Sequence, residues 1–268
     1  MHRQRLLSAL LLIPAFLLLV HFGSAFHFTL LVSLVIALAA WEFSRLCPEG
    51  TDVGLSLVTI LGALGWHVAV VSTGGLAGVG ATVAAAALVR ATVVRAGFRV
   101  GLVQGAWIVL GVTYVAGLLS FVSLLRGLPE GRQLIYYLTF TMWAGDTGAF
   151  YLGSWIGRRA IAPRISPKKT VEGALGGLAA TLLVALAGSI ALWPRLSWGK
   201  AAWVGLLLAV VGIIGDLCES AVKRAASVKD SGTVIPGHGG MLDRLDSLMF
   251  AGPVLYVLVW LEIGRAHV

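Results

Sequence analysis

The chain of 268 residues is strongly apolar and basic, with 58% hydrophobic residues, 12% charged residues and a formal net charge of +8. A soluble protein of this length would need more charged side chains to cover its surface. The composition therefore excludes an ordinary soluble domain and indicates a membrane protein. The basic excess does not indicate nucleic-acid binding, because the sequence has no basic helix with interleaved aromatic residues and no known nucleic-acid module.

Apolar runs follow one another along nearly the whole chain, and a helix of about 20 apolar residues crosses a bilayer. They predict an all-α, polytopic integral membrane protein with about nine transmembrane helices. The first run follows the basic segment "MHRQR" as a secretory signal would, but we interpret it as an uncleaved helix because every later run also belongs in the membrane. The predicted spans are Leu6–Val20, Ala25–Trp41, Val53–Val71, Leu76–Val89, Leu102–Leu125, Leu134–Leu152, Ala174–Trp193, Ala201–Leu217 and Leu248–Leu261.

Lysine and arginine predict the orientation, because cytoplasmic loops of membrane proteins carry an excess of them. With nine spans and the N-terminus inside, 15 of the 20 basic residues fall on the cytoplasmic side. These residues favour anionic lipid headgroups or anionic cytosolic solutes as partners. The basic residues on the outer side are Arg126, Arg132, Arg195, Lys200 and Arg265.

The chain reads as one continuous membrane domain whose two parts differ in polar chemistry. Residues 1–132 form N-terminal transmembrane helices with little polar chemistry, and residues 133–268 form the transmembrane region that carries the candidate catalytic residues. The two cysteines, Cys47 and Cys218, are too few and too far apart in sequence to indicate a zinc site or a disulfide framework.

The first charged segment, "WAGDTGAFYLGSWIGRR", places Asp146 inside an apolar span. A carboxylate at membrane depth is costly unless it is paired, which favours a functional role. The alternative is a packing role, in which Asp146 bonds to a serine or threonine of a neighbouring helix. The flanking glycines would let another helix backbone come close.

The second segment, "RISPKKTVEGALGG", predicts a helix that starts at Ser166 and Pro167. Lys168, Lys169, Thr170 and Glu172 would then crowd its first turns. Free N–H groups at a helix N-terminus attract phosphate, and lysines beside them strengthen the attraction. The alternative is an ordinary basic cytoplasmic loop with a capped helix.

The third segment runs from "GDLCESAVKR" to "DRLDS" and is rich in acids. On a helix, Asp216, Ser220 and Lys223 share one face, and Asp243 and Asp246 would point the same way if their segment is helical. Two carboxylates about 6 Å apart repel by roughly 3 kcal/mol at an effective dielectric constant near 20. The spacing therefore predicts a hard cation such as Mg²⁺, which uses carboxylates and substrate phosphates as ligands.

A glycine-rich loop, "GHGG" at 237–240, lies within this segment and can approach a ligand closely. His238 is open to three interpretations: a hydrogen-bonding strut, an acid or base, or a ligand. Arg224 fits a juxtamembrane anchor as well as a phosphate contact. The residues together predict a site at the cytoplasmic edge of the bilayer for a polyphosphate ligand and an anionic lipid.

The segment "SAVKRAASVKDSGTVIPGHGGMLDRLD", Ser220–Asp246, resembles the signature of the phosphatidate cytidylyltransferases, the CDP-diacylglycerol synthases. "SPKKTVEG" and "GDTGAFYLG" also resemble segments of that family, so the likeness extends over about Asp146 to Asp246. A signature with so many fixed polar positions is much more specific than a lone glycine motif. The N-terminal spans carry no comparable signature.

The resemblance implies a reaction in which CTP and phosphatidate give CDP-diacylglycerol and pyrophosphate with Mg²⁺ as cofactor, leaving a second cation open. It implies a location in a bacterial-type inner membrane, with the active site facing the cytoplasm. The implied partners are CTP, phosphatidate and the lipid bilayer, and a homodimer is compatible with the resemblance. The residues to which it assigns catalysis are Asp216, Lys223, Asp243 and Asp246, of which Asp216, Asp243 and Asp246 would bind the metal. The residues that it assigns to substrate binding are Ser166, Lys168, Lys169, Thr170, Glu172, Arg224, Lys229, His238, Gly239, Gly240, Arg244 and Asp146.

Within that set, the resemblance assigns triphosphate contacts to Ser166, Lys168, Lys169 and Thr170. Glu172 would orient a lysine or a metal-bound water. Lys223 and Arg224 would hold the phosphate of phosphatidate. Two alternatives stay open from the sequence. One is a related CTP-dependent enzyme that acts on a polyprenol or an ether lipid. The other is a cation-coupled transporter that uses Asp146, Asp216 and Asp243, although the charge of this chain lies in one half and transporters usually have two related halves.

Overall fold

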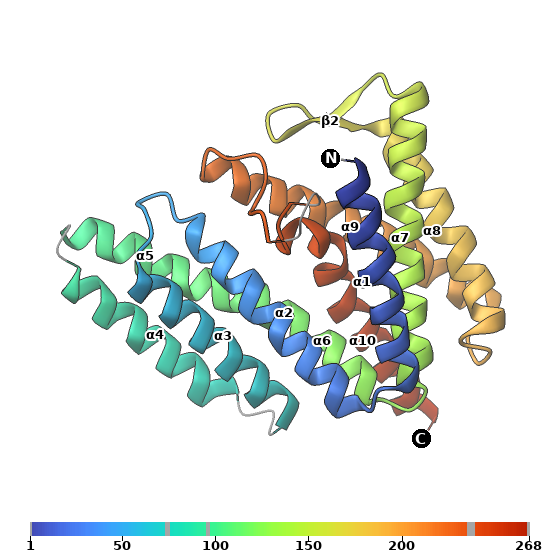
Figure 1. Cartoon of the computed structure of the whole chain (residues 1–268). Helices are drawn as coiled ribbons and strands as arrows, with labels where there is room; N and C mark the ends of the chain where they lie inside the picture. Colours follow the sequence, from blue (N-terminus) through green and yellow to red (C-terminus); the bar gives the residue numbers. More distant parts are fainter. Residues whose placement is uncertain (1, 73–75, 95–96, 235–238, 267–268) are drawn as a thin grey trace. The chain divides into compact units, whose positions relative to one another are not determined.

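The computed structural model describes residues 2–72, 76–94, 97–234 and 239–266, which are nearly all helical (Figure 1). The π-helical turn η1 (Val112–Ala116) joins two helices without a break, and the 3₁₀ turn η2 (Leu242–Arg244) precedes the last helix. The α-helices are α1 (His2–Phe22), α2 (Ala25–Arg45), α3 (Val53–Ser72), α4 (Leu76–Val93), α5 (Phe98–Gly111), α6 (Gly117–Gly127), α7 (Gly131–Ile156), α8 (Val171–Ala191), α9 (Trp198–Ala225) and α10 (Asp246–Ala266).

Among the described residues, five helical segments are long and apolar enough to cross a membrane, judged by length and composition. The prediction of a helical protein with several apolar helices is therefore confirmed, whereas the number of nine spans stays a prediction. The five segments are Ala25–Arg45, Val53–Ser72, Phe98–Gly127, Val171–Ala191 and Trp198–Ala225.

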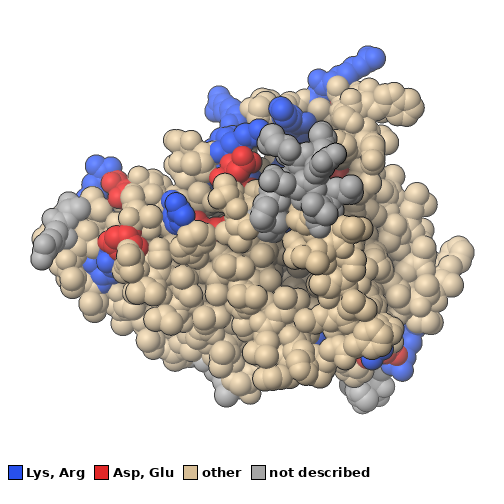
Figure 2. Space-filling view, viewed as in Figure 1, with Lys and Arg blue, Asp and Glu red and all other residues tan. Residues whose placement is uncertain are grey.

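Large apolar side chains are exposed on several of these helices, among them Leu61, Leu183 and Trp203. On the face that Figure 2 shows, residues other than Lys, Arg, Asp and Glu form most of the surface, and the charged side chains gather in a few places. Exposed large apolar side chains are unfavourable in water and suit contact with lipid. The surface thus supports the assignment to a membrane.

The chain forms two compact units, and the first consists of Met1–Ser123 and Val222–Arg244. In it α2 packs against α3, and α4 packs against α5. Phe43 of α2 is fully buried and stacks on Trp107 of α5, whose indole N–H donates to the Phe43 carbonyl at 2.9 Å. The segment Val222–Arg244, which includes the end of α9 and the loop after it, is part of the same compact unit as the N-terminal helices. The predicted division at residue 132, drawn from polar chemistry, stays a prediction.

The second unit consists of Leu124–Ala221 and Leu245–Val268, and its main contact is between α7 and α8, which run side by side (Figure 1). Glycines make this close packing possible. A Cβ atom on Gly148 of α7 would lie 2.6 Å from the carbonyl oxygen of Gly176 of α8, and one on Gly176 would lie 2.7 Å from the Leu152 Cβ. Small residues let helix backbones approach in this way in membrane proteins.

A two-stranded antiparallel hairpin joins α7 to α8, formed by β1 (Ala160–Ala162) and β2 (Ser166–Thr170). The predicted helix start at Ser166 and Pro167 is therefore wrong. Pro167 favours an extended conformation at Ser166, and the helix begins only at Val171. Thr170 is its N-cap, since the Thr170 hydroxyl accepts a hydrogen bond from the Gly173 N–H at 3.1 Å.

Candidate functional site

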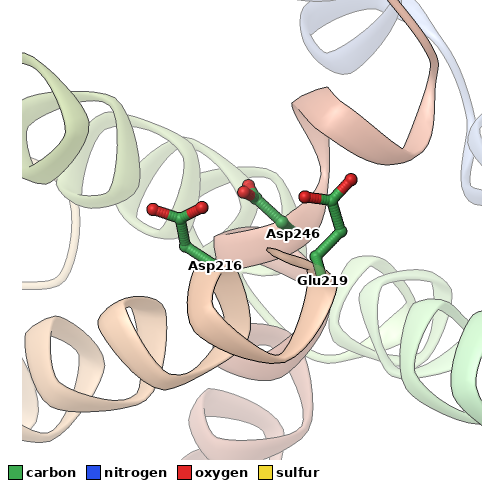
Figure 3. Close-up of side chains that lie close together, drawn as sticks. All are labelled: Asp216, Glu219 and Asp246. Atoms are coloured by element: carbon green, nitrogen blue, oxygen red, sulfur yellow. The ribbon is translucent and has the colours of Figure 1, made fainter. Parts of the chain in front are cut away.

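Three carboxylates from two helices of the second unit come together in the structure. Asp216 and Glu219 lie three residues apart on α9, so they share one face, and Asp246 is the first residue of α10. One carboxylate oxygen from each lies within 4.8 Å of the others. Figure 3 shows Asp246 between Asp216 and Glu219, with all three carboxylates on the same side of α9. We call these three residues the acidic cluster.

Close backbone packing brings the two helices to this distance. A Cβ atom on Gly215, next to Asp216, would lie 2.5 Å from the carbonyl oxygen of Asp246, so only glycine allows α9 to approach the start of α10 so closely. Asp246 itself begins a helix, where its Oδ1 accepts a hydrogen bond from the Ser247 N–H at 2.8 Å. The cluster is thus fixed by backbone contacts rather than by flexible side chains.

The carboxylates of the acidic cluster are electrostatically crowded. Glu219 is only 2% exposed, and Asp246 is half-buried. Burial first, and then the carboxylates of Asp216 and Glu219, raise the pKa of Asp246 well above its usual range. Three carboxylates this close need a proton or a cation between them. Oxygen donors alone, without histidine or cysteine in the group, fit a hard cation such as Mg²⁺.

A positive side chain already lies against the acidic cluster. Lys169 of β2 forms an ion pair with Asp216 through its Nζ, which also donates to the Ser220 hydroxyl at 3.3 Å. The hairpin therefore places one of the two predicted triphosphate lysines next to a predicted metal ligand. Lys168, its neighbour on the strand, is exposed.

A narrow cavity of about 60 Å³ lies beside the acidic cluster in the second unit. Asp146 of α7 and Asp216 of α9 both line it, together with Thr181 of α8 and Ser247 of α10. Asp146 therefore lines the same cavity as Asp216 of the acidic cluster, and its functional role stays a prediction.

Asp243 forms a second group of contacts, in the first unit. Its Oδ1 accepts from Lys223 Nζ at 2.6 Å, and the side chains of Asp243 and Lys223 are 11% and 13% exposed. Its Oδ2 accepts from the N–H groups of Ser231 and Gly240 at 3.0 and 2.9 Å and from the Ser231 hydroxyl at 3.0 Å. The carboxylate thus holds the loop between α9 and η2 and a helical lysine at once. A metal-binding role for Asp243 stays a prediction.

The spacing of three would place Asp243 and Asp246 on one face if their segment were helical. The structure does not place them on one α-helix. Asp243 belongs to the 3₁₀ turn η2, and α10 begins at Asp246. By contrast, Asp216, Ser220 and Lys223 do lie on one helix, α9, as predicted.

Glu172 contacts the main chain at the start of the hairpin. Its Oε2 accepts from the N–H groups of Arg158 and Arg159 at 3.0 and 3.2 Å, and its Oε1 accepts from Arg159 Nε at 3.2 Å. These contacts join the end of α7 to the start of α8. Glu172 thus helps to hold the hairpin in place. Its role in orienting a lysine or a metal-bound water stays a prediction.

The remaining predicted residues are placed as follows. Gly239 has a φ of 89°, as expected of a glycine-rich loop, and Gly240 is buried. Arg224 donates from Nη1 to the Val228 carbonyl at 3.0 Å. His238 lies outside the described residues. Ser166 is half-buried on β2, and Lys229 and Arg244 are exposed.

Two acids were missed from the sequence. Glu219 could have been predicted from the sequence, because it follows Asp216 by three residues in "GDLCES" and so shares its face on a helix. Glu42, in the apolar helix α2, is 1% exposed, and its Oε2 accepts from the Leu242 N–H at 3.0 Å and from the Ser231 hydroxyl at 3.3 Å. It had no signal, because Leu242 and Ser231 lie about 190 to 200 positions away.

Apolar helices and a close group of three carboxylates define a helical membrane protein with a candidate cation site. Comparison with known proteins gives the family. The cytidylyltransferase family matches residues 3–262, and the chain belongs to it.

Curated relatives named phosphatidate cytidylyltransferase are similar to parts of the chain. The protein of a Synechocystis strain is 50% identical over 133 residues, which are 49% of this chain and 44% of the relative. That of Bacillus subtilis is 39% identical over 154 residues, 57% of each chain. One from Staphylococcus aureus is 39% identical over 161 residues, 60% of this chain and 61% of the relative. The chain thus matches about half the length of these relatives.

Proposed function

We propose that this protein transfers a cytidylyl group from CTP to phosphatidate, giving CDP-diacylglycerol and pyrophosphate in phospholipid biosynthesis. The observation that carries the proposal is the acidic cluster, with a lysine ion-paired to it, in a chain of the cytidylyltransferase family. A phosphate oxygen of the lipid attacks the α-phosphorus of CTP in line, and the bond to pyrophosphate breaks. Such a transfer depends on positioning and charge neutralisation more than on covalent catalysis.

Asp216, Glu219 and Asp246 are the proposed cation ligands, with Asp243 as a further ligand to be tested. Mg²⁺ bound there would neutralise charge on the triphosphate and on the departing pyrophosphate. The chain's own contribution is a fixed and crowded set of carboxylates. Because their mutual repulsion is relieved by a cation, binding of CTP with its cation is favoured at this position.

The proposed triphosphate contacts lie on β2. Lys169 links Asp216 to Ser220, so a triphosphate entering there would exchange one anionic partner of this lysine for another. Lys168, which is exposed, Ser166 and the N-cap residue Thr170 complete the proposed set. Lysine acts toward phosphate as a compact charge and needs no fixed geometry.

Lys223 and Arg224 are the proposed contacts for the lipid phosphate, with Lys229, His238, Gly239, Gly240 and Arg244 supporting that segment. The structure gives Lys223 a fixed position, because its Nζ is bound to Asp243 at 2.6 Å. No base is required to activate the attacking group, since a phosphate monoester is already ionised near neutral pH.

The membrane arrangement is part of the proposal. Nine spans follow from the apolar runs, and an active site facing the cytoplasm follows from the distribution of lysine and arginine. A bacterial-type inner membrane follows from the family resemblance and is consistent with bacterial relatives. A homodimer is compatible with this arrangement. Cross-linking of the detergent-purified protein would measure its oligomeric state.

The family membership favours nucleotidyl transfer over the cation-coupled transporter. It leaves the acceptor to be decided, because an apolar helix face does not identify the lipid that it contacts. Phosphatidate and a polyprenol are therefore the two acceptors to compare.

The test is an acceptor assay with the purified protein in detergent, Mg²⁺ and CTP labelled at the α-phosphorus. We expect label in the lipid fraction with phosphatidate and none with a polyprenol or a polyprenyl phosphate. Label that enters the polyprenol product instead would support the alternative acceptor. Absence of label from every lipid, with a protein that is folded by circular dichroism, would refute the proposed reaction.

A further inference from the structure

Glu42 is a buried acid in a helix that the sequence places outside the polar chemistry. It lies near the end of α2, is 1% exposed and belongs to the first unit, as does the segment Val222–Arg244. A carboxylate removed from water is costly unless hydrogen bonds compensate it. The groups that donate hydrogen bonds to Glu42 therefore show which part of the chain it positions.

Two donors to the Glu42 carboxylate come from the segment that follows α9. The Leu242 N–H donates to Oε2 at 3.0 Å from η2, and the Ser231 hydroxyl donates to the same oxygen at 3.3 Å. Ser231 is itself buried, at 7% exposure. Glu42 therefore ties Ser231, in the loop after α9, and Leu242, the first residue of η2, to α2.

The Ser231 hydroxyl connects Glu42 to Asp243. It lies 3.3 Å from Glu42 Oε2 and 3.0 Å from Asp243 Oδ2, and it has one hydrogen to share between these carboxylates. Asp243 also accepts the Ser231 N–H and holds Lys223. A continuous chain of contacts thus runs from Glu42 through Ser231 and Asp243 to Lys223.

Two glycines of the loop enclose the Glu42 carboxylate. A Cβ atom on Gly232 would lie 2.6 Å from Oε1, and one on Gly240 would lie 2.7 Å from Oε2 and 1.9 Å from the Ser231 Oγ. Neither position accepts a larger side chain without moving the carboxylate or the loop. Gly240 is thus required by its packing on Glu42, in addition to any contact with a ligand.

We propose that Glu42 is a positioning residue for the transfer reaction. It fixes the loop between α9 and η2 and, through Ser231, the orientation of Asp243 and Lys223. The proposal rests on the proposed function for its effect on catalysis, whereas its effect on the loop stands on the contacts alone. Partners that orient site residues in this way typically affect activity by about 10- to 100-fold when they are removed.

The experiment compares Glu42→Ala and Glu42→Gln with the unchanged protein by amide hydrogen exchange and by steady-state kinetics. The informative amides are those of Ser231 and Gly240, because they donate to Asp243 and not to Glu42. If Glu42 had only a local role, its removal would speed hydrogen exchange at the Leu242 amide alone, because that N–H donates directly to Glu42. Glu49→Ala is the matched control, since Glu49 is a more exposed acid in the turn that follows α2.

For Glu42→Ala we expect exchange at Ser231 and Gly240 to become at least about 10-fold faster and kcat to fall by about 10- to 100-fold. Glu42→Gln should restore much of both, because its amide oxygen can still accept from Leu242 and Ser231. Faster exchange at Leu242 alone, or an unchanged kcat in Glu42→Ala, would overturn the proposal. So would a Glu42→Gln variant that protects the loop fully but is as slow as Glu42→Ala.

If Glu42→Ala does not fold, Glu42→Gln and Ser231→Ala decide the matter. Ser231→Ala breaks the same chain of contacts one step further on and should also release the Gly240 amide, and an unchanged Gly240 amide there would contradict the proposal. The exchange measurement needs no CTP. A protein that transfers nothing to lipid but shows the expected exchange would refute the proposed function and leave the role of Glu42 in the loop intact.

Discussion

Replacing Asp246 with Asn is expected to abolish cytidylyl transfer while leaving the protein at least as stable as before. Asn removes one of three carboxylates that lie within 4.8 Å of one another, so the proposed cation would lose a ligand. A catalytic metal contributes several kcal/mol to the transition state. Since each ~1.4 kcal/mol is tenfold in rate, the loss should reach about 1000-fold.

The stability half of this prediction follows from the same crowding. Burial and two neighbouring carboxylates disfavour the ionised form of Asp246, so a neutral side chain of the same shape relieves repulsion in the folded state. Thermal unfolding in detergent should therefore show an unchanged or raised midpoint. Glu262→Gln, on the same helix and in an ion pair with Lys200, is the control and should keep its activity. Retention of more than a tenth of the transfer rate by Asp246→Asn would exclude a ligand role.

Asp243→Asn is expected to abolish transfer as well, but with a loss of stability. The Asp243 carboxylate accepts the Lys223 ammonium on one oxygen and two N–H groups and a hydroxyl on the other. In either orientation, the amide group of Asn places a donor against a donor. Breaking one partner of a buried ion pair costs about 3–5 kcal/mol, and the small exposure of this pair reduces that figure only in part.

Unfolding and activity measured together separate the two acids. Asp243→Asn should lower the unfolding midpoint and speed hydrogen exchange at the Ser231 and Gly240 amides, whereas Asp246→Asn should do neither. Glu49→Gln is the control within the first unit. An Asp243→Asn variant with normal stability, normal loop protection and no transfer would point instead to the direct metal-binding role predicted from the sequence.

The apolar runs and the α9 spacing were readable from the sequence for physical reasons. A membrane span is a property of about 20 consecutive residues, and the common face of Asp216, Ser220 and Lys223 follows from helical periodicity alone. Glu219 obeys the same rule, because it follows Asp216 by one helical turn. Local signals of this kind need no knowledge of tertiary contacts.

The errors came from contacts between distant residues and from competition between local signals. Ser166 and Pro167 resemble a helix start, but the antiparallel pairing of Ala160 with Thr170 and the capping of Gly173 by Thr170 move the start to Val171. Glu42 reaches its partners across about 190 residues, which no local pattern encodes. Asp243 and Asp246 would share a face only if their segment were one helix, and the chain instead breaks between η2 and α10.

The central claim is that acids of α9 and α10 hold a hard divalent cation on which transfer from CTP to a lipid depends. The most direct measurement is the rate of label transfer from CTP to phosphatidate by the purified protein while Mg²⁺ is removed with a chelator and then returned. The account predicts that transfer stops on chelation, returns with Mg²⁺, and does not return in Asp246→Asn. Transfer that continues at an undiminished rate in excess chelator would contradict it.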